Sequence, residues 1–382
     1  MQANRDYQIC TRCVMDTTDA YITFDENGIC DHCNDFDINI KPNWVTDETS
    51  EEKIIRVIEK IKFEGKNKEF DSILGLSGGV DSCYMLHLAV KKFGLRPLVF
   101  HVDGGWNTEL AVHNINVMID KLGLDLYTEV INWEEMKDFQ LAFFKSGVPH
   151  LDTPQDHAFI ATLYNFAQKH GIKYILNGGN FSTECVQYPM YWIYYGTDML
   201  QINDILNKFG SIKMETFPFS SIFKHKIYLR YFKGVEVIKP LNHLPYFKND
   251  AIQLLENEYG WRRYPQKHYE SIFTRFFEGY WLPKRFGFDT RRAQFSSLIL
   301  TGQMERLEAL EQLKIQAFNP DTINEEFSYI ATKLGITTSE LQKYFDMPKK
   351  FYWDYKNQQN IFRIGARILN LLGIEKVKKR KK

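Results

Sequence analysis

No segment of the sequence approaches the ~18 consecutive apolar residues that read as a transmembrane helix. Residues 1–11 are polar and contain no apolar stretch of the signal-peptide type. Neither charge is in excess, because 48 basic residues balance 48 acidic ones. We therefore expect a cytoplasmic protein without a membrane partner. The neutral balance also argues against a nucleic-acid partner, which usually requires a basic excess.

Cysteine is scarce, with six among 382 residues, and four of the six lie close together near the N-terminus. Cys10 and Cys13, and then Cys30 and Cys33, form two pairs with two-residue spacers. Two such turns can aim four thiolates at one tetrahedral ion. The alternative of two disulfides is disfavoured in a reducing cytoplasm. The spacing therefore predicts a structural Zn²⁺ site, with no open position for catalysis.

Apolar residues are plentiful, at 44%, and the chain is long enough for a sizeable core and two or three domains. Short apolar runs alternate with helical segments, which predicts an α/β fold with a doubly wound, parallel, five-stranded sheet. We expect strands at 71–76, 96–102, 125–130, 173–176 and 235–238, and helices from 83, at 109–122 and at 156–170.

The first of these strands leads directly into a glycine-rich turn and then a helix. Such a junction binds anions, because its N–H groups and the helix dipole point at the ligand. Its sequence is neither the Walker motif nor G-x-G-x-x-G. It resembles the pyrophosphate loop (PP-loop) of the ATP pyrophosphatase superfamily, whose members split ATP into AMP and pyrophosphate. The residues of the turn are Ser77, Gly78, Gly79, Val80, Asp81 and Ser82.

Ligands of such sheets bind at the carboxyl ends of the strands, near the point where the strand order reverses. This rule gathers the loop, residues 102–105 and residues 177–184 around one crevice. The resemblance implies that adenine lies at the end of the second strand and that a glycine turn flanks the phosphates. The nucleotide-binding residues expected outside the loop are His101, Val102, Asp103 and Gly178.

Three residues are expected to carry the chemistry. Asp81 is an odd neighbour for a phosphate unless Mg²⁺ lies between them, and the resemblance adds Glu184 as a second Mg²⁺ ligand. It also implies that Lys248 offsets the charge that builds as pyrophosphate leaves. The alternative for Lys248 is a solvated position at a helix N-terminus.

Residues 262–292 carry eight basic and three acidic side chains, interleaved with aromatic residues. In a neutral protein this pattern predicts a local anion-binding patch. It suits the diphosphate or carboxylate of a nucleotide sugar, with RNA backbone as the rival ligand and a solvated helix face as the structural alternative. The candidate substrate residues are Arg263, Lys267, Arg275 and Arg285.

Four motifs together resemble the N-acetyl sugar amidotransferase family. They are Cys-Val-Met-Asp-Thr-Thr-Asp at 13–19, Leu-Ser-Gly-Gly-Val-Asp-Ser at 76–82, His-Val-Asp-Gly-Gly-Trp-Asn at 101–107 and Asn-Gly-Gly-Asn at 177–180. The resemblance implies a role in lipopolysaccharide or flagellin-glycan biosynthesis. Members use ATP to convert the acetamido group of a nucleotide-activated N-acetyl sugar into an acetamidino group. ATP, Mg²⁺ and Zn²⁺ are the expected cofactors.

No stretch of the chain is left for a glutaminase domain, so we expect ammonia from a separate glutaminase. The resemblance implies relatives of the histidine-biosynthesis amidotransferase and cyclase subunits. Two other functions stay open: a tRNA thiolation enzyme of the same superfamily, and a non-catalytic ATP-binding scaffold. We expect a zinc module at 1–45, the PP-loop ATP pyrophosphatase domain at 46–250 and a helical substrate or partner region at 251–382, ending in a solvated basic tail at 376–382.

Overall fold

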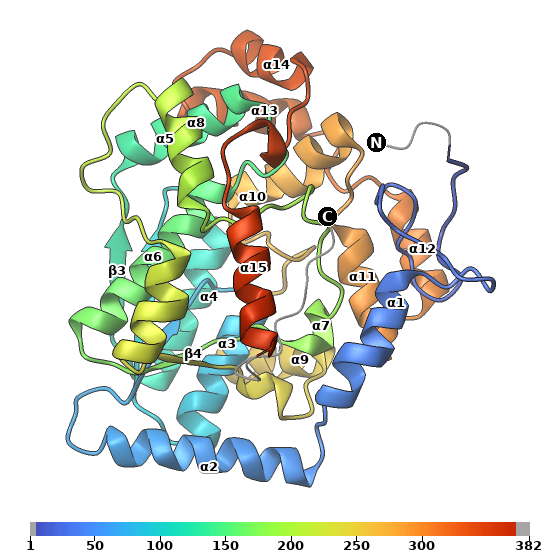
Figure 1. The fold of residues 1–382 in the computed structure, drawn as a ribbon. Helices are drawn as coiled ribbons and strands as arrows, with labels where there is room; N and C mark the ends of the chain where they lie inside the picture. Colours follow the sequence, from blue (N-terminus) through green and yellow to red (C-terminus); the bar gives the residue numbers. More distant parts are fainter. Residues whose placement is uncertain (1–4, 372–382) are drawn as a thin grey trace.

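A five-stranded parallel sheet forms the centre of the computed structural model, which describes residues 5–371 (Figure 1). The strand order is β3-β2-β1-β4-β5, and each neighbouring pair is parallel. The order reverses between β1 and β4, where a ligand crevice is expected. All five predicted strands are confirmed. Their bounds are β1 Ser72–Gly75, β2 Pro97–Asp103, β3 Leu126–Val130, β4 Tyr174–Leu176 and β5 Glu236–Ile238.

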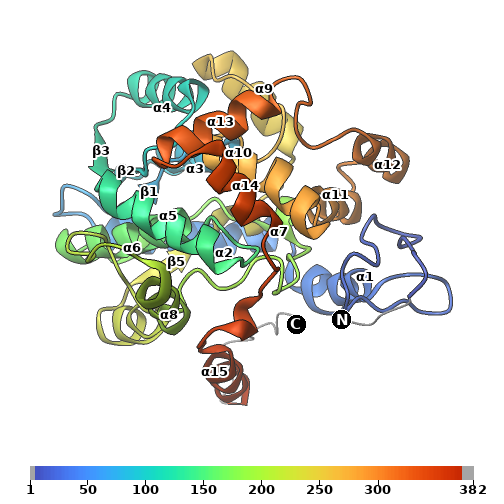
Figure 2. The same ribbon diagram turned by 90° about the horizontal axis from the view of Figure 1, so that it is seen from above.

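The three central strands, β1, β2 and β4, are largely buried on both faces, and side chains of β1 and β2 alternate between two hydrophobic cores. Ile73 and Leu98 belong to one core, and their neighbours Leu74 and Val99 belong to the other. Figure 2 shows α4 and α9 on one side of the strands and α6 and α8 on the other. The doubly wound α/β class is therefore confirmed. The helices of this part are α2 Glu48–Glu64, α3 Val80–His87, α4 Glu109–Leu122, α5 Trp133–Ser146, α6 Thr153–Lys169, α7 Phe181–Glu184, α8 Met199–Phe209 and α9 Lys248–Tyr259.

The chain after α9 is helical, as predicted, and its aromatic residues join the larger of the two cores. Trp281 packs edge-on against Phe144 of α5, with ring centroids 4.8 Å apart. Two of these helices, α13 and α14, pack against each other. The helices are α10 Ile272–Phe276, α11 Arg291–Leu300, α12 Arg306–Lys314, α13 Ile323–Lys333, α14 Thr338–Asp346 and α15 Gln359–Leu371.

A third, smaller core surrounds the four N-terminal cysteines, α1 (Asp31–Asp35) and Ala293 of α11. In this region Phe24 and Cys30 form an isolated antiparallel bridge. Shorter turns of π type lie at Phe36–Ile40, Leu88–Lys92, Lys224–Phe232 and Phe277–Phe286, and 3-10 turns at Lys41–Asn43, Pro240–Asn242 and Tyr352–Asp354.

None of the helices within residues 5–371 is long and apolar enough to cross a membrane. The predicted basic tail at 376–382 lies outside the described residues. The domain boundaries at 45 and 250 stay predictions.

Candidate active site

The phosphate loop joins β1 to α3, and two of its serines form hydrogen bonds within it. The hydroxyl oxygens of Ser77 and Ser82 lie 3.2 Å apart, and Gly79 N–H donates to the Ser77 hydroxyl at 3.3 Å. Gly78 has a φ of +85°, which glycine adopts without strain. Gly79 is the N-cap residue of α3, and no side chain caps this helix within the described part of the chain. The N–H groups of its first turn are therefore left for a ligand.

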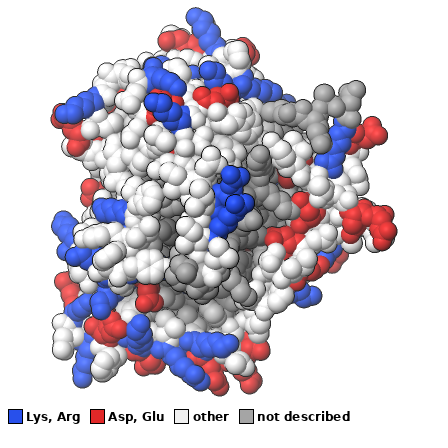
Figure 3. All heavy atoms as spheres, in the orientation of Figure 1, with Lys and Arg blue, Asp and Glu red and all other residues white. Residues whose placement is uncertain are grey.

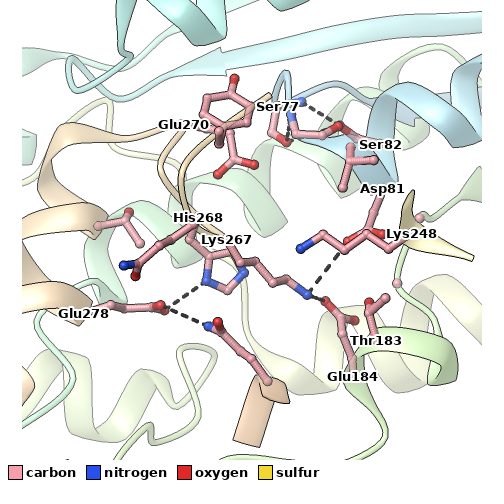
Figure 4. Close-up of a pocket in the computed structure, with 18 of the residues that line it drawn as sticks. Ser77, Asp81, Ser82, Thr183, Glu184, Lys248, Lys267, His268, Glu270 and Glu278 are labelled. Carbon is pink, nitrogen blue, oxygen red and sulfur yellow. Dashed lines mark hydrogen bonds and ion pairs between the residues drawn. The ribbon is translucent and has the colours of Figure 1, made fainter. Parts of the chain in front are cut away.

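This loop forms one wall of a cavity of about 860 Å³ (Figure 4). The second wall is the segment after β4, and the third comes from the start of α9 and from the helical C-terminal region. The predicted crevice at the reversal of strand order is therefore present. Its polar lining includes Ser77, Asp81, Ser82, Gly178, Glu184, Lys248, Arg263, Lys267, His268, Glu270, Glu278 and Gln294.

The predicted magnesium ligands lie on either side of a lysine. Lys267 Nζ is 2.6 Å from Glu184 Oε1 and 3.8 Å from Asp81 Oδ2. Burial opposes charge on both partners, but their attraction outweighs it: the pKa of Glu184 is lowered and that of Lys267 is raised. Asp81 also accepts hydrogen bonds through Oδ1, from the Tyr246 hydroxyl at 2.6 Å and from Asn180 at 3.2 Å. A cation is therefore already favoured between the two carboxylates.

These residues fit Mg²⁺ only together with a substrate. Mg²⁺ is usually bound by one or two carboxylates plus substrate phosphates and water. Asp81 and Glu184 supply two carboxylates beside a loop that suits phosphates. Within residues 5–371, the one group of three or more close metal-binding side chains is the cysteine cluster. The phosphates of ATP would have to complete the magnesium site.

Lys248 begins α9, and its side chain lines the cavity as predicted. Figure 4 shows its ammonium group directed into the same space as that of Lys267. Burial lowers the pKa of Lys248, and the positive charge of Lys267 lowers it further. A buried ammonium group beside another positive charge is stabilised by a new negative charge next to it, such as the charge on a departing pyrophosphate.

The sequence did not reveal a charged histidine in the opposite wall. His268 Nδ1 lies 3.0 Å from Glu278 Oε1. Burial lowers the pKa of His268, but the Glu278 carboxylate outweighs burial and raises this pKa to about 9. Among residues 5–371, His268 is the one non-glycine residue with positive φ, at 66°. A backbone conformation of this kind is found where the surroundings fix a side chain in place.

Glu270 is a second residue that the sequence analysis missed. Its carboxyl group lies against the phosphate loop: a Cβ atom on Gly79 would be 2.2 Å from Glu270 Oε1. A side chain at position 79 would therefore require the Glu270 carboxyl group to move. Burial raises the pKa of Glu270.

Two of the four predicted substrate residues lie elsewhere, which corrects the expectation of one anion patch. Arg285 donates to the carbonyl oxygens of Tyr344, Phe345 and Met347, and so holds the end of α14. Arg275 donates to Glu326 of α13 at 3.1 Å. Their charges are used inside the helical region because buried carbonyls and carboxylates there need donors. Only Arg263 and Lys267 of the four line the cavity.

The end of the second strand also lies outside this cavity. His101 is buried, with Nδ1 2.8 Å from the Leu76 carbonyl oxygen and Nε2 2.8 Å from Asn107. Asp103 accepts from Gly105 N–H at 2.7 Å. Neither these two residues nor Val102 lines the cavity. The adenine contact at this strand end stays a prediction.

The four N-terminal cysteines form one cluster rather than two pairs. Their Sγ atoms lie 3.7 Å apart for Cys10 and Cys33, 3.5 Å for Cys13 and Cys30, and 3.6 Å for Cys30 and Cys33. Four sulfurs at ~2.3 Å from a tetrahedral zinc ion would be ~3.8 Å apart. Backbone N–H groups of Arg12, Cys13 and Cys30 point at the sulfur of Cys10 at 3.2–3.4 Å. The cluster fits zinc.

The helical region braces this cluster from outside. Arg306 of α12 donates to the carbonyl oxygens of Cys10, at 2.7 Å, and Cys13, at 3.0 Å. Arg292 of α11 forms an ion pair with buried Asp16 at 2.9 Å and donates to the Val14 carbonyl at 2.8 Å. Arg292 of the basic segment therefore braces the cysteine cluster, whereas Arg263 lines the cavity.

Residues 270–369 match a family model described as the C-terminal domain of WbpG-like lipopolysaccharide biosynthesis proteins. We call residues 270–369 the WbpG-like region, after the domain that they resemble. The predicted relation to lipopolysaccharide biosynthesis proteins is thereby confirmed. The residues that this region contributes to the cavity beside the phosphate loop include Glu270, Thr274, Phe277, Glu278, Arg291 and Gln294.

Solved structures similar to this chain include two synthetases. The NMN synthetase from Francisella tularensis is 18% identical, covers 75% of this chain and 95% of its own, and has a TM-score of 0.32. The NH3-dependent NAD synthetase from Campylobacter jejuni is 15% identical, covers 78% and 98%, and has a TM-score of 0.28. A comparison with curated protein sequences finds no match to the chain.

Proposed function

We propose that this protein is an ATP-dependent amidotransferase that acts on a nucleotide-activated N-acetyl sugar. One observation carries the proposal. The WbpG-like region and a loop of the ATP pyrophosphatase type line the same cavity. Under this proposal, the part of the chain that resembles lipopolysaccharide biosynthesis proteins walls the site where ATP is split.

The proposed reaction has two steps. The oxygen of the acetamido group attacks the α-phosphorus of ATP, and pyrophosphate leaves. The product is an imidate that carries AMP on this oxygen, which turns a poor leaving group into a good one. Ammonia then attacks the imidate carbon, its excess proton passes to solvent, and AMP leaves with the oxygen. The sugar keeps an acetamidino group.

The residues of the cavity suit these steps. The N–H groups of the loop, with the hydroxyls of Ser77 and Ser82, bind the pyrophosphate portion of ATP. Asp81 and Glu184 would hold Mg²⁺, which when bound neutralises phosphate charge. Lys248 lies where it can stabilise the negative charge of the leaving pyrophosphate.

The opposite wall suits a polar, uncharged group such as a sugar. Glu278 accepts from His268, and Gln294 reaches both Glu278 Oε2, at 3.5 Å, and the Tyr188 hydroxyl, at 3.0 Å. Such a network presents both donors and acceptors to hydroxyl groups. Closing the cavity around the substrate would keep out the water that hydrolyses an activated imidate.

The decisive experiment compares substrates in ATP–pyrophosphate exchange. We expect exchange to rise with UDP-linked N-acetyl sugars and not with tRNA. With ammonium salt, mass spectrometry should show the small mass decrease that replacement of oxygen by NH produces. Stimulation by tRNA would instead indicate the thiolation enzyme. Absence of exchange with every substrate would indicate a non-catalytic scaffold.

A further inference from the structure

The helix α11 has one side in the cavity and the other side against the N-terminal segment that carries the cysteines. Its cavity side has the spacing of one helix face and consists of Arg291, Gln294, Phe295 and Leu298. On the other side, Ser296 Oγ accepts from Val14 N–H at 3.2 Å, and Ala293 belongs to the core around the cysteines. Figures 1 and 2 show α11 between the strands and the N-terminal segment.

The helix α12 is placed in the same way. Glu308 and Gln312 line the cavity and are four residues apart, so they lie on one side of the helix. Arg306 precedes Glu308 by two residues and so lies on the other side of a helix with about 3.6 residues per turn. There its guanidinium group donates to the carbonyl oxygens of Cys10 and Cys13. The first cysteine pair is therefore hydrogen-bonded to the back of a cavity wall.

The surface of the N-terminal segment does not suit nucleic acid, which some zinc modules bind. Residues 5–45 contain eight acidic and three basic residues. Figure 3 shows acidic side chains on the side where this segment and α12 lie in Figure 1. Phosphate backbones bind to basic surfaces instead. The contacts of the segment that can serve a function are therefore those with α11 and α12.

The wall formed by α11 and α12 adjoins the phosphate-binding part of the cavity at Lys248. The backbone N–H of Lys248 donates to Gln303 Oε1 at 2.8 Å, and Gln303 lies in the connection between the two helices. The wall combines the amides of Gln294 and Gln312 with the ring of Phe295. Amides bind hydroxyl groups, and an aromatic ring packs against the face of a sugar or a base. This wall suits an acceptor substrate better than the phosphates of ATP.

We propose that the zinc-bound turn of Cys10 and Cys13 positions α11 and α12 and thereby sets the affinity of the cavity for its acceptor substrate. The inference rests on the proposed function, in which the acceptor is a nucleotide-activated N-acetyl sugar. Zn²⁺, when bound, would fix the turn whose carbonyl oxygens hold Arg306. Arg306 is thus a positioning residue, because it acts on the cavity through Glu308 and Gln312.

The first test is the KM of Arg306→Gln for each substrate, measured on zinc-loaded protein. We expect the KM for the acceptor to rise on the order of 10-fold, because the variant loses charged hydrogen bonds that hold the wall. The KM for ATP should stay near that of the wild type, since the phosphate loop lies on another wall. Arg306→Lys keeps a charged donor and should restore part of the affinity. The control is Arg56→Gln on α2, at an exposed pair with Glu52, which should change neither KM.

The second test is hydrogen exchange of the full-length protein, which needs no substrate. Amides of α12 should exchange faster in Arg306→Gln than in the wild type. They should also exchange faster in the wild type after treatment with a zinc-selective chelator. Amides of α4, whose residues 109–122 do not line the cavity, should be unchanged in both cases.

The two tests separate this proposal from the proposed function. If the wild type turns over no nucleotide sugar, the proposed function fails, and hydrogen exchange alone decides whether the cysteine turn positions α12. The positioning role is overturned if the exchange of α12 changes neither in Arg306→Gln nor after zinc removal. It is also overturned if the variant keeps the acceptor KM of the wild type. Equal rises of both KM values would indicate a general structural role and would overturn it too.

Discussion

The ammonium group of Lys267 lies 2.6 Å from the carboxylate of Glu184, on the line toward Asp81 (Figure 4). The lysine thus provides a positive charge where the sequence predicted a metal ion. Two carboxylates so close to a phosphate loop would repel a nucleotide unless a cation stood between them.

The first prediction concerns Lys267→Met. Loss of the ammonium group removes the charge that holds the two carboxylates and faces the phosphates. We expect kcat/KM for ATP to fall on the order of 10²-fold, as when one preorganised charge is removed from an active site. Lys314→Met is the matched control, because Lys314 pairs with Glu311 at 2.6 Å on the exposed face of α12. Equal losses in the two variants, or none in Lys267→Met, would contradict the assignment.

Asp81→Asn tests the proposed magnesium ligand. The amide keeps an oxygen for the Tyr246 hydroxyl, so the fold should stay intact. Turnover should fall by a factor on the order of 10² or more, most clearly at limiting Mg²⁺, because the amide is a weaker ligand. Asp120→Asn, on the exposed side of α4, serves as the control. Near-normal activity at limiting Mg²⁺ would remove Asp81 from the metal site.

The His268–Glu278 pair should leave a signature in stability against pH. The folded pKa of His268, about 9, is above the ordinary value of 6.5, so the protonated form stabilises the fold. This contribution is complete below pH 6.5 and is lost as pH rises through about 9. In urea unfolding, the wild type should therefore have a higher free energy of unfolding than His268→Gln at low pH. This difference should become smaller as pH rises from 6.5 through about 9. The difference in unfolding free energy between wild type and Glu278→Gln should become smaller in the same way. A difference that does not change with pH would refute the pairing of His268 with Glu278.

Cys30→Ser tests the zinc module. A closed four-thiolate site contributes folding energy, so loss of one ligand should lower zinc content and cause aggregation or a lower melting temperature. Cys83→Ser is the control, because Cys83 is buried in another core; the protein with this substitution should retain the zinc of the N-terminal cluster. Metal analysis and thermal unfolding are the measurements. If the Cys30 variant were stable and zinc-loaded but inactive, the thiolate would be catalytic.

The last prediction concerns the nitrogen source. The isolated chain should work with high ammonium and turn over faster as pH rises, because only free NH3 is nucleophilic. Glutamine alone should support no amidination until the partner glutaminase is added. Product formation followed by mass spectrometry separates these conditions. Glutamine-dependent turnover by the purified single chain would show that it contains a glutaminase after all.

The parts of this protein that could be predicted from the sequence are those with local causes. A Cys-x2-Cys turn or the Ser77–Ser82 loop is specified by neighbouring residues, and each strand shows as a short apolar run. The fold class, the cysteine cluster and the cavity at the strand reversal followed from these local patterns. The helix α5 was missed, although Asn132 caps it and Gly147 ends it.

The remaining site residues depend on how the chain folds back on itself. His268 pairs with Glu278, ten positions later, and Glu270 lies against Gly79 of the phosphate loop. Neither contact follows from a local pattern in the sequence. The prediction that Arg285 binds substrate was wrong for a different reason. A charged residue in a basic segment suggests an exposed patch, whereas the carbonyls of α14 that it serves become visible only in three dimensions.

The contact between Arg306 and the carbonyl of Cys10 spans 296 positions along the chain. During translation the cysteines leave the ribosome first and the arginine that braces them follows near the end. Metal capture by the nascent N-terminus would therefore precede completion of its surroundings. An N-terminal fragment cut before α12 would keep all four thiolates and lose their brace. We therefore expect the complete, folded chain to retain the metal more tightly than such a fragment does.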